Sequence, residues 1–282
     1  MNTNLRIGTC SWNYSSWVGL IYSDSKQTAA EYLKEYSKKY NTVEIDSWFY
    51  RIPSKSEVIA YKNSVHSDFR FTCKVPQEIT LTHMREKNSN GKYVVNPFFL
   101  SVEQFNRFLN AIDTLLPQMD YIMCEFEYLN KEKMGSLNEF MDKIASFIGK
   151  IPKGLPYSLE PRNKNYLTEK YFSFLQSNNL GHVFSEKIYM PHIYDVYNQF
   201  KEFISGDTVI RLMGRDRGEI EERTNNQWNK IVEEKADKDK IVEMIVELVR
   251  KSKVTVNVNN HYEGSAPLTI AKLMEMIETK LD

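Results

Sequence analysis

The chain has 282 residues, and its 37 Lys and Arg residues balance 37 Asp and Glu residues, so the formal net charge is zero. This balance excludes an overall positive field that would attract nucleic acid, and any basic patch must be local. Cys10, Cys73 and Cys124 are far apart, which argues against a disulfide framework or a zinc cluster. No apolar run is long enough to cross a membrane, so we expect a soluble, cytoplasmic protein.

Segments with strand character alternate along the whole chain with segments of helical periodicity. The expected strands are residues 5–11, 43–46, 69–75, 119–126, 156–161, 181–185, 208–213 and 253–260. The expected helices are residues 28–39, 54–66, 101–115, 131–148, 168–178, 193–204, 228–251 and 268–280. Residues 76–100 form the longest segment without a regular pattern, and a loop of that length is usually functional or mobile.

Eight strands that alternate with helices, without a low-complexity linker, predict an α/β protein with a (β/α)8 TIM barrel in one domain over residues 1–282. An open, doubly wound sheet is the main alternative. The sequence contains no GxGxxG or GxxxxGK[ST] motif that would support a nucleotide-binding version of that sheet. The barrel is therefore the better prediction, with its active face at the carboxyl ends of the strands.

Strand alternation predicts which side chains point into the barrel, because successive residues face opposite sides of a strand. The predicted inner ring comprises Glu44, Lys74, Glu125, Glu160, Arg211 and Asn257, with Arg162 and Asn259 just above it. Aromatic residues border the expected mouth, namely Trp12, Tyr14, Trp17, Phe49 and Tyr50. The ring is either an ion-pair network that fills the barrel top or the floor of a pocket for a polar ligand.

These residues can be compared with the requirements of four kinds of site: a metal site, a glycosidase, a Ser/His/Asp triad and an anion site. His83 and His261 follow strands and could join Glu44 and Glu160 around a metal, but no HxH or HExxH motif occurs, and we expect no metal and no cofactor. Paired glutamates would suit a glycosidase, although the interleaved cations would keep them ionised. No GxSxG elbow supports a Ser/His/Asp triad. Lys74, Arg162, Arg211 and the loop MGRDRG favour an anion site.

Six stretches together resemble the DUF72 (YecE-like) family over nearly the whole chain. They are RIGTCSWNYSSWVG, VEIDSWFYRIP, FRFTCKVPQEITLTH, LEPRN, VIRLMG and VNVNNHYEGSAP. The resemblance implies a TIM barrel and, for the family, no established activity. Similarity of such barrels to endonuclease IV-like and xylose isomerase-like enzymes has suggested nucleic-acid ligands, which is an argument by fold analogy.

The resemblance also implies a set of recurring polar and aromatic positions. They match Trp12, Glu44, Tyr50, Lys74, His83, Glu160, Arg162, Arg211, Asn259 and Asn260 in this chain. Three positions depart from the family pattern, which commonly has Asn at Asp46, Gln at Glu125 and His at Met213. The expected mouth is therefore more acidic than is usual in the family, and it lacks one histidine.

We expect a protein that binds a small phosphorylated or nucleic-acid-derived ligand at the barrel mouth, with hydrolysis and isomerisation both left open. In this hypothesis Lys74, Arg162 and Arg211 hold the anion, and Glu44 or Glu160 is the general base. Trp12 and Tyr50 stack on the ligand, and the remaining binding residues are Tyr14, His83, Glu125, Asn257, Asn259 and Asn260. The alternatives are a non-catalytic binding or scaffold protein with a structural ion-pair network, and a carbohydrate-active enzyme that uses paired glutamates.

Overall fold

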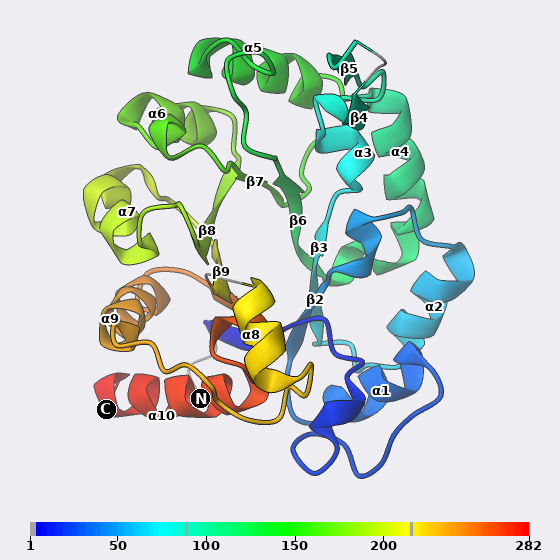
Figure 1. Ribbon diagram of the computed structural model, residues 1–282, viewed down its shortest axis with the longest axis vertical. Coiled ribbons are helices and arrows are strands. Elements are labelled where there is room, and N and C mark those ends of the chain that lie inside the picture. The colour runs from blue at the N-terminus through cyan, green and yellow to red at the C-terminus, as the bar shows by residue number, and fades with distance from the viewer. Residues whose placement is uncertain (1–3, 88–89, 215–216, 282) are drawn as a thin grey trace.

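Eight parallel strands close into a barrel in the computed structural model, in the order β1–β10–β9–β8–β7–β6–β3–β2 (Figure 1). The structure describes residues 4–87, 90–214 and 217–281. The barrel strands are β1 (Leu5–Cys10), β2 (Thr42–Ile45), β3 (Arg70–Lys74), β6 (Met119–Glu125), β7 (Tyr157–Glu160), β8 (Gly181–Lys187), β9 (Thr208–Gly214) and β10 (Val254–Val258). The predicted (β/α)8 barrel is confirmed.

Helices surround the barrel and connect its strands (Figure 1). The α-helices are α1 (Ala29–Tyr36), α2 (Lys55–Asn63), α3 (Gln77–Thr80), α4 (Val102–Ala111), α5 (Leu137–Ile148), α6 (Glu169–Ser177), α7 (Ile193–Phe200), α8 (Arg217–Thr224), α9 (Lys238–Val249) and α10 (Ala266–Leu281). Short 3-10 helices are η1 (Ser15–Trp17), η2 (Ser47–Phe49), η3 (Asp113–Gln118), η4 (Lys164–Tyr166), η5 (Lys201–Phe203) and η6 (Asn260–Tyr262). Within the described residues, no helix combines the length and apolar character needed to span a membrane.

Hydroxyl side chains determine where several helices begin. Thr28 accepts a hydrogen bond from the backbone N–H of Glu31, whose carboxylate in turn accepts from the Thr28 backbone, which completes a capping box at α1. Ser136 caps α5, because its hydroxyl accepts a hydrogen bond from the backbone N–H of Glu139. The sequence predicted that this helix starts near residue 131, but the cap places its first turn at Leu137.

The structure differs from the predicted elements in two loops at the mouth. The segment 76–100, expected to be irregular, contains α3 and a two-stranded antiparallel hairpin of β4 (His83–Lys87) and β5 (Tyr93–Val95). The predicted helix 228–251 begins only at Lys238, because residues 228–237 run as a loop. Helix α8 forms in the preceding segment, where a loop was expected.

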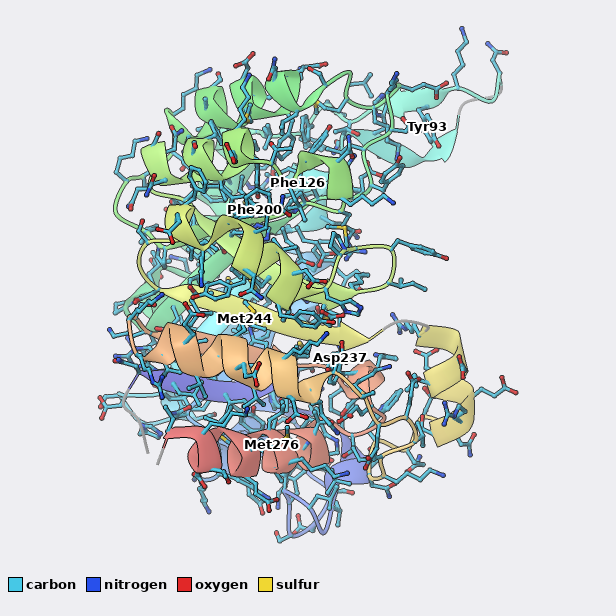
Figure 2. All side chains as sticks on the ribbon, turned by 90° about the vertical axis from the view of Figure 1, so that its left-hand side faces the viewer. Tyr93, Phe126, Phe200, Asp237, Met244 and Met276 are labelled. Carbon is cyan, nitrogen blue, oxygen red and sulfur yellow. The ribbon has the colours of Figure 1, made fainter. Side chains whose placement is uncertain are left out.

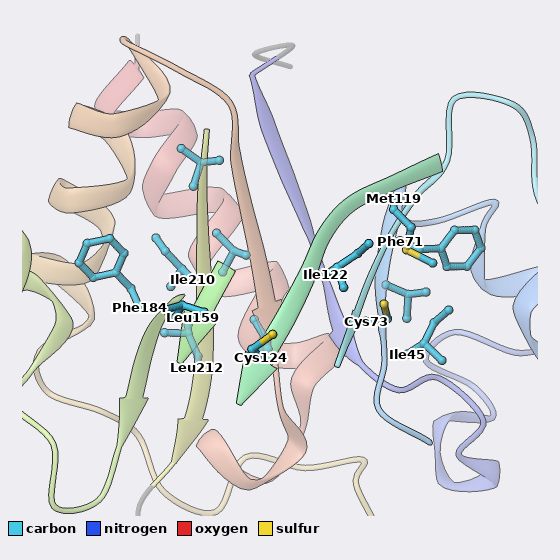
Figure 3. Close-up of a cluster of buried hydrophobic side chains, with 14 of the residues drawn as sticks. Ile45, Phe71, Cys73, Met119, Ile122, Cys124, Leu159, Phe184, Ile210 and Leu212 are labelled. Atoms are coloured by element: carbon cyan, nitrogen blue, oxygen red, sulfur yellow. The ribbon is translucent and has the colours of Figure 1, made fainter. Parts of the chain in front are cut away.

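Apolar side chains fill both sides of the strands. Those on the outer side belong to the main hydrophobic core, and Figure 3 shows some of them along the strands, including Phe71, Ile122 and Leu212. On the inner side, Tyr121, Met123, Val183 and Val209 form a separate buried cluster. Two residues further along β6 and β9 lie Glu125 and Arg211, so the charged ring stands on this apolar plug at the carboxyl end of the barrel.

Candidate functional site at the barrel mouth

Arg211 lies at the centre of a cluster of buried carboxylates inside the barrel. Its Nε and Nη2 donate to the two oxygens of Glu44, and both donor–acceptor distances are 2.7 Å. Its Nη1 donates to Glu160 at 2.5 Å and to Glu125 at 3.2 Å. All three guanidinium nitrogens are thus engaged by protein carboxylates, and the side chains of Arg211 and Glu44 are 0% exposed. Arg211 cannot reach an external anion without breaking one of these pairs.

Lys74 extends the cluster toward the mouth. Its ammonium lies 2.5 Å from Asp46 and 3.5 Å from Glu125, and it sits 4.3 Å from the centre of the Phe49 ring. Burial disfavours the ammonium form of Lys74, but Glu125 and Asp46 outweigh this effect and hold its pKa above the ordinary value. Burial likewise opposes the charge of Glu125, yet Lys74, Arg162 and Arg211 lower its pKa to about 2. Lys74 and Glu125 are therefore both charged at neutral pH.

A cavity of about 580 Å³ opens above the cluster. Its cationic lining comprises Lys74, Arg162, Lys187 and Arg217; its acidic lining comprises Asp46, Glu125 and Glu127; its aromatic wall comprises Tyr14, Phe49 and Tyr50. Strands β3, β6, β8 and β9 contribute residues at their carboxyl ends, as the barrel fold predicts for a ligand site. The cavity is large enough for a small organic ligand.

Two of these cations keep donors that the protein does not use. Arg162 pairs through Nη2 with Glu125, but its Nε is buried and has no hydrogen-bond partner among the described residues. The side-chain ammonium of Lys187 makes no hydrogen bond or ion pair with any residue that the structure describes. Burial and the neighbouring Arg162 lower the pKa of Lys187 to about 8. On the side of the cavity formed by β7 and β8, Lys187 therefore lacks an ion-pair partner, and Arg162, although paired with Glu125, keeps one unused donor.

His261 and Asn259 line the cavity where β10 ends. The Oδ1 of Asn259 accepts from the backbone N–H of His261 and lies 2.6 Å from its Nδ1. The Nε2 of His261 lies 3.1 Å from Glu221, which also accepts from the Nε of Arg217 at 2.7 Å. Burial lowers the pKa of His261 despite the opposing effect of Glu221. The imidazole is thus positioned at the cavity with an acceptor beside each ring nitrogen.

Residues 6–282 match the family described as "Protein of unknown function DUF72". The chain belongs to the DUF72 family. The resemblance predicted from six sequence stretches is confirmed over almost the whole chain.

Two solved structures of DUF72 family proteins are similar to this chain in fold. The structure of EF0366 from Enterococcus faecalis V583 is 20% identical, with 98% of this chain and 95% of that chain covered and a TM-score of 0.67. The structure of TM1631 from Thermotoga maritima MSB8 is 18% identical, with 97% and 99% covered and a TM-score of 0.68. A comparison with curated proteins found no match.

Several residues predicted for the site of this DUF72 protein do meet at the mouth. Glu44, Lys74, Glu125, Glu160 and Arg211 form one ion-pair cluster, as strand alternation predicted. Only part of the predicted set borders the cavity itself, and this part is Tyr14, Tyr50, Lys74, Glu125, Arg162 and Asn259.

Other predicted residues do not face the cavity. Trp12 is only 3% exposed, because its indole donates to the backbone oxygen of Ala29 and packs edge-on against Tyr61, so it cannot stack on a ligand. Glu44 is enclosed by Arg211, which removes it as a general base that touches the ligand. Glu160 likewise lies beneath the cavity lining.

Three more predicted residues lie elsewhere. Asn257 is buried and donates to Thr72, and Asn260 is buried with its Oδ1 accepting from the backbone of α10. His83 lies on β4 beside Tyr93, in a neighbouring groove of about 940 Å³. His83 and His261, considered together as metal ligands, therefore border different cavities.

Sequence reasoning missed Lys187 as a site residue. The predicted sixth strand ended at Ser185, whereas β8 continues to Lys187, and one further step of alternation from Val183 and Ser185 would have placed Lys187 inside the barrel. The loop MGRDRG contributes Met213, Gly214 and Arg217 to the cavity, but its positions 215 and 216 lie outside the described residues.

Proposed function

We propose that this DUF72 protein binds a small phosphorylated ligand in the mouth cavity, with Arg162 and Lys187 as the residues that hold the phosphate. The observation that carries the proposal is the pair of unused donors, Arg162 Nε and the Lys187 ammonium, on one side of the cavity. The buried Nε of Arg162 is costly for a folded protein while it lacks a partner, and an anionic ligand would supply an acceptor for Arg162 and for the half-buried Lys187. Lys74 and Arg211, also expected to hold the anion, already have carboxylate partners.

The rest of the cavity suits an organic group attached to the phosphate. Tyr14, Phe49 and Tyr50 provide apolar ring surface opposite the cationic side. Tyr50 also borders the larger groove that contains His83, and Gln77 and Leu81 line both spaces. A ligand with a ring system, such as a nucleoside monophosphate, could place its phosphate at Arg162 and its ring along Tyr50.

His261 is the acid–base group that this arrangement favours. It lines the cavity, whereas Glu44 and Glu160 lie beneath the lining. Glu221 and Asn259 orient its ring, which is the usual support for a histidine that transfers protons. In the proposal, proton transfer to or from a bound ligand runs through His261, and the buried glutamates stabilise the cations around them.

A non-catalytic binding or scaffold protein is the alternative that a specific observation favours. Arg211 forms ion pairs with Glu44, Glu125 and Glu160, so the charges of the cluster are accounted for without a ligand, although Oε1 of Glu160 has no hydrogen-bond partner among the described residues. A carbohydrate-active enzyme is disfavoured, because Glu125 has a lowered pKa and Glu44 and Glu160 are held by Arg211.

Calorimetric titration and thermal-shift measurements with phosphorylated compounds test the proposal. The panel contains inorganic phosphate, sugar phosphates and nucleoside monophosphates, each beside its unphosphorylated counterpart. The variant Lys187→Met should lower phosphate affinity by at least about 10-fold, since a charge-assisted hydrogen bond contributes about 1.5–3 kcal/mol. Lys131→Met, at an exposed lysine outside the cavity, is the matched control and should bind as the parent does.

Two results would overturn the proposal. One is a folded Lys187→Met variant that binds every phosphorylated compound as tightly as the parent. The other is a panel in which no phosphorylated compound binds or raises the melting temperature, which would favour the scaffold alternative.

A further inference from the structure

We infer that Glu186, His192 and Asp237 form a binding site for a divalent transition-metal ion beside the barrel mouth. The three side chains offer one ligand atom each, and these atoms lie within 4.8 Å of one another. The Nδ1 of His192 is 2.9 Å from a Glu186 oxygen and 3.4 Å from an Asp237 oxygen. Such a spacing lets a single ion contact all three atoms after small side-chain adjustments.

The ligands come from three separate elements of the fold. Glu186 is the penultimate residue of β8, His192 precedes α7, and Asp237 precedes α9. Figure 2 shows Asp237 at the end of α9 that faces the same side of the molecule as Tyr93 of the mouth hairpin. The site is therefore built at the carboxyl end of the barrel strands, where this fold places functional residues.

Further contacts orient each ligand. The second oxygen of Glu186 accepts from the backbone N–H of Ile193 at 3.0 Å. The hydroxyl of Tyr194 donates to Asp237 at 3.4 Å, and its ring stacks on the imidazole of His192 at 5.1 Å with an angle of 7° between the planes. Outer contacts of this kind hold metal ligands in position in known sites.

A buried hydroxyl group provides a second, independent observation. The three ligands line a cavity of about 340 Å³, and Tyr262 lines the same cavity. Tyr262 is 1% exposed, and its Oη has no hydrogen-bond partner among the described residues. A buried hydroxyl group normally has a partner, and water bound to an ion in this cavity would supply one.

Charge also favours a cation in this cavity. Three neighbouring lysines are paired with other acids, namely Lys235 with Glu233, Lys238 with Glu263, and Lys272 with Glu234, while Lys240 lies 4.9 Å from the centre of the Tyr194 ring. Among the described residues, Glu186 and Asp237 form no ion pair with a lysine or arginine, and their shared partner is His192. Two carboxylates thus face one imidazole with a net negative charge.

The donor set indicates which ions fit. One imidazole nitrogen with two carboxylate oxygens suits zinc, manganese or iron(II), whereas magnesium and calcium prefer oxygen ligands alone. Three protein ligands leave positions for water or for a ligand atom. Gly214 lines both this cavity and the mouth cavity, so the two spaces adjoin.

Metal titration of the full chain tests the inference. The protein is freed of metal with a chelator, dialysed, and titrated separately with Zn²⁺, Mn²⁺ and Mg²⁺ by calorimetry. We expect one Zn²⁺ or Mn²⁺ per chain, with Mg²⁺ weaker, and a fall in affinity of at least about 10-fold in His192→Ala and in Asp237→Asn. The matched controls are His66→Ala, an exposed histidine, and Glu234→Gln, an acid of the same cavity that is paired with Lys272; both should bind as the parent does.

A crystal soaked in Mn²⁺ provides a readout that does not depend on the folding of any variant. Anomalous density between Glu186, His192 and Asp237 supports the site. Absence of that density, absence of stoichiometric binding, or equal binding by a folded His192→Ala variant would overturn it. Neither experiment uses the phosphate ligand, so this inference can fail while the proposed function stands, and the reverse also holds.

Discussion

Arg211 and Glu44 face each other through two parallel hydrogen bonds of 2.7 Å, although their strands β9 and β2 are not neighbours in the barrel. The pair therefore joins distant parts of the sheet across its interior. Charges that have been removed from water depend on each other, so loss of one partner leaves the other without compensation.

Replacement of Arg211 should destabilise the protein strongly. Arg211→Met leaves Glu44 and Glu160 buried without their cation, and we expect a loss of about 3–5 kcal/mol in the free energy of unfolding. Urea denaturation measures the loss. Arg250→Met, at an exposed arginine, is the control and should change stability by less than about 0.5 kcal/mol. A well-folded Arg211→Met protein of unchanged stability would show that the cluster does not support the fold.

Gly214 should not tolerate a side chain. Its φ is +81°, and a Cβ there would lie 2.1 Å from the backbone oxygen of His261. Gly154 has a φ of +79° with nothing within 4 Å of the added Cβ, so Gly154→Ala isolates the backbone cost of about 1–2 kcal/mol. We expect Gly214→Ala to cost about 1–3 kcal/mol more than Gly154→Ala. Equal losses of stability in the two variants, measured by thermal unfolding, would mean that the backbone at His261 moves away from the added Cβ without a measurable cost.

Two aromatic residues of the mouth sequence should behave differently. Trp12 is buried, and Trp12→Ala should cost about 3–5 kcal/mol of stability. Tyr50 is 60% exposed, so Tyr50→Ala should change stability by less than about 0.5 kcal/mol while it weakens binding of an aromatic phosphate. Chemical denaturation and ligand titration on both variants measure these effects. A stable Trp12→Ala protein with impaired binding would restore Trp12 to the site.

His182 should make stability depend on pH. Burial among aromatic side chains lowers its pKa from 6.5 to about 3, so the folded protein keeps the imidazole neutral. Below pH 6.5 the unfolded chain takes up a proton that the folded chain does not, and stability falls as pH decreases toward 3. The upper limit is about 1.4 kcal/mol per pH unit, and the accessible part of the ring reduces it.

Unfolding curves at several pH values between 7 and 4 measure this dependence. His182→Gln should flatten the slope relative to the parent. His66→Gln, at an exposed histidine, should leave it as it is. An identical slope in the His182→Gln protein would assign the pH dependence to other groups.

Strand alternation predicted the charged cluster because each of its members lies within a strand. Glu44, Lys74, Glu125 and Arg211 follow the period of two, and the barrel closes them onto one axis. The period of two does not continue beyond the end of a strand. Trp12 follows β1 by two residues, and nothing in its neighbours indicates that the chain turns it back against Ala29.

Contacts between residues of different loops could not be predicted from the sequence for the same reason. Glu186 belongs to a strand, but His192 and Asp237 meet it only because two loops end at adjacent helix starts. The inward position of Lys187 could have been predicted, because the alternation through Val183 and Ser185 continues to Lys187. The missing information was the length of the strand.

An apolar plug lies beneath the charged cluster and limits how small molecules can move through the barrel. It consists of Tyr121, Met123, Val183 and Val209. A packed floor offers no passage along the barrel axis, so a ligand must enter and leave on the mouth side of the barrel. A new ligand can therefore enter the cavity only after the bound one has left. For an enzyme on this fold, a product that lingers would compete directly with the next substrate.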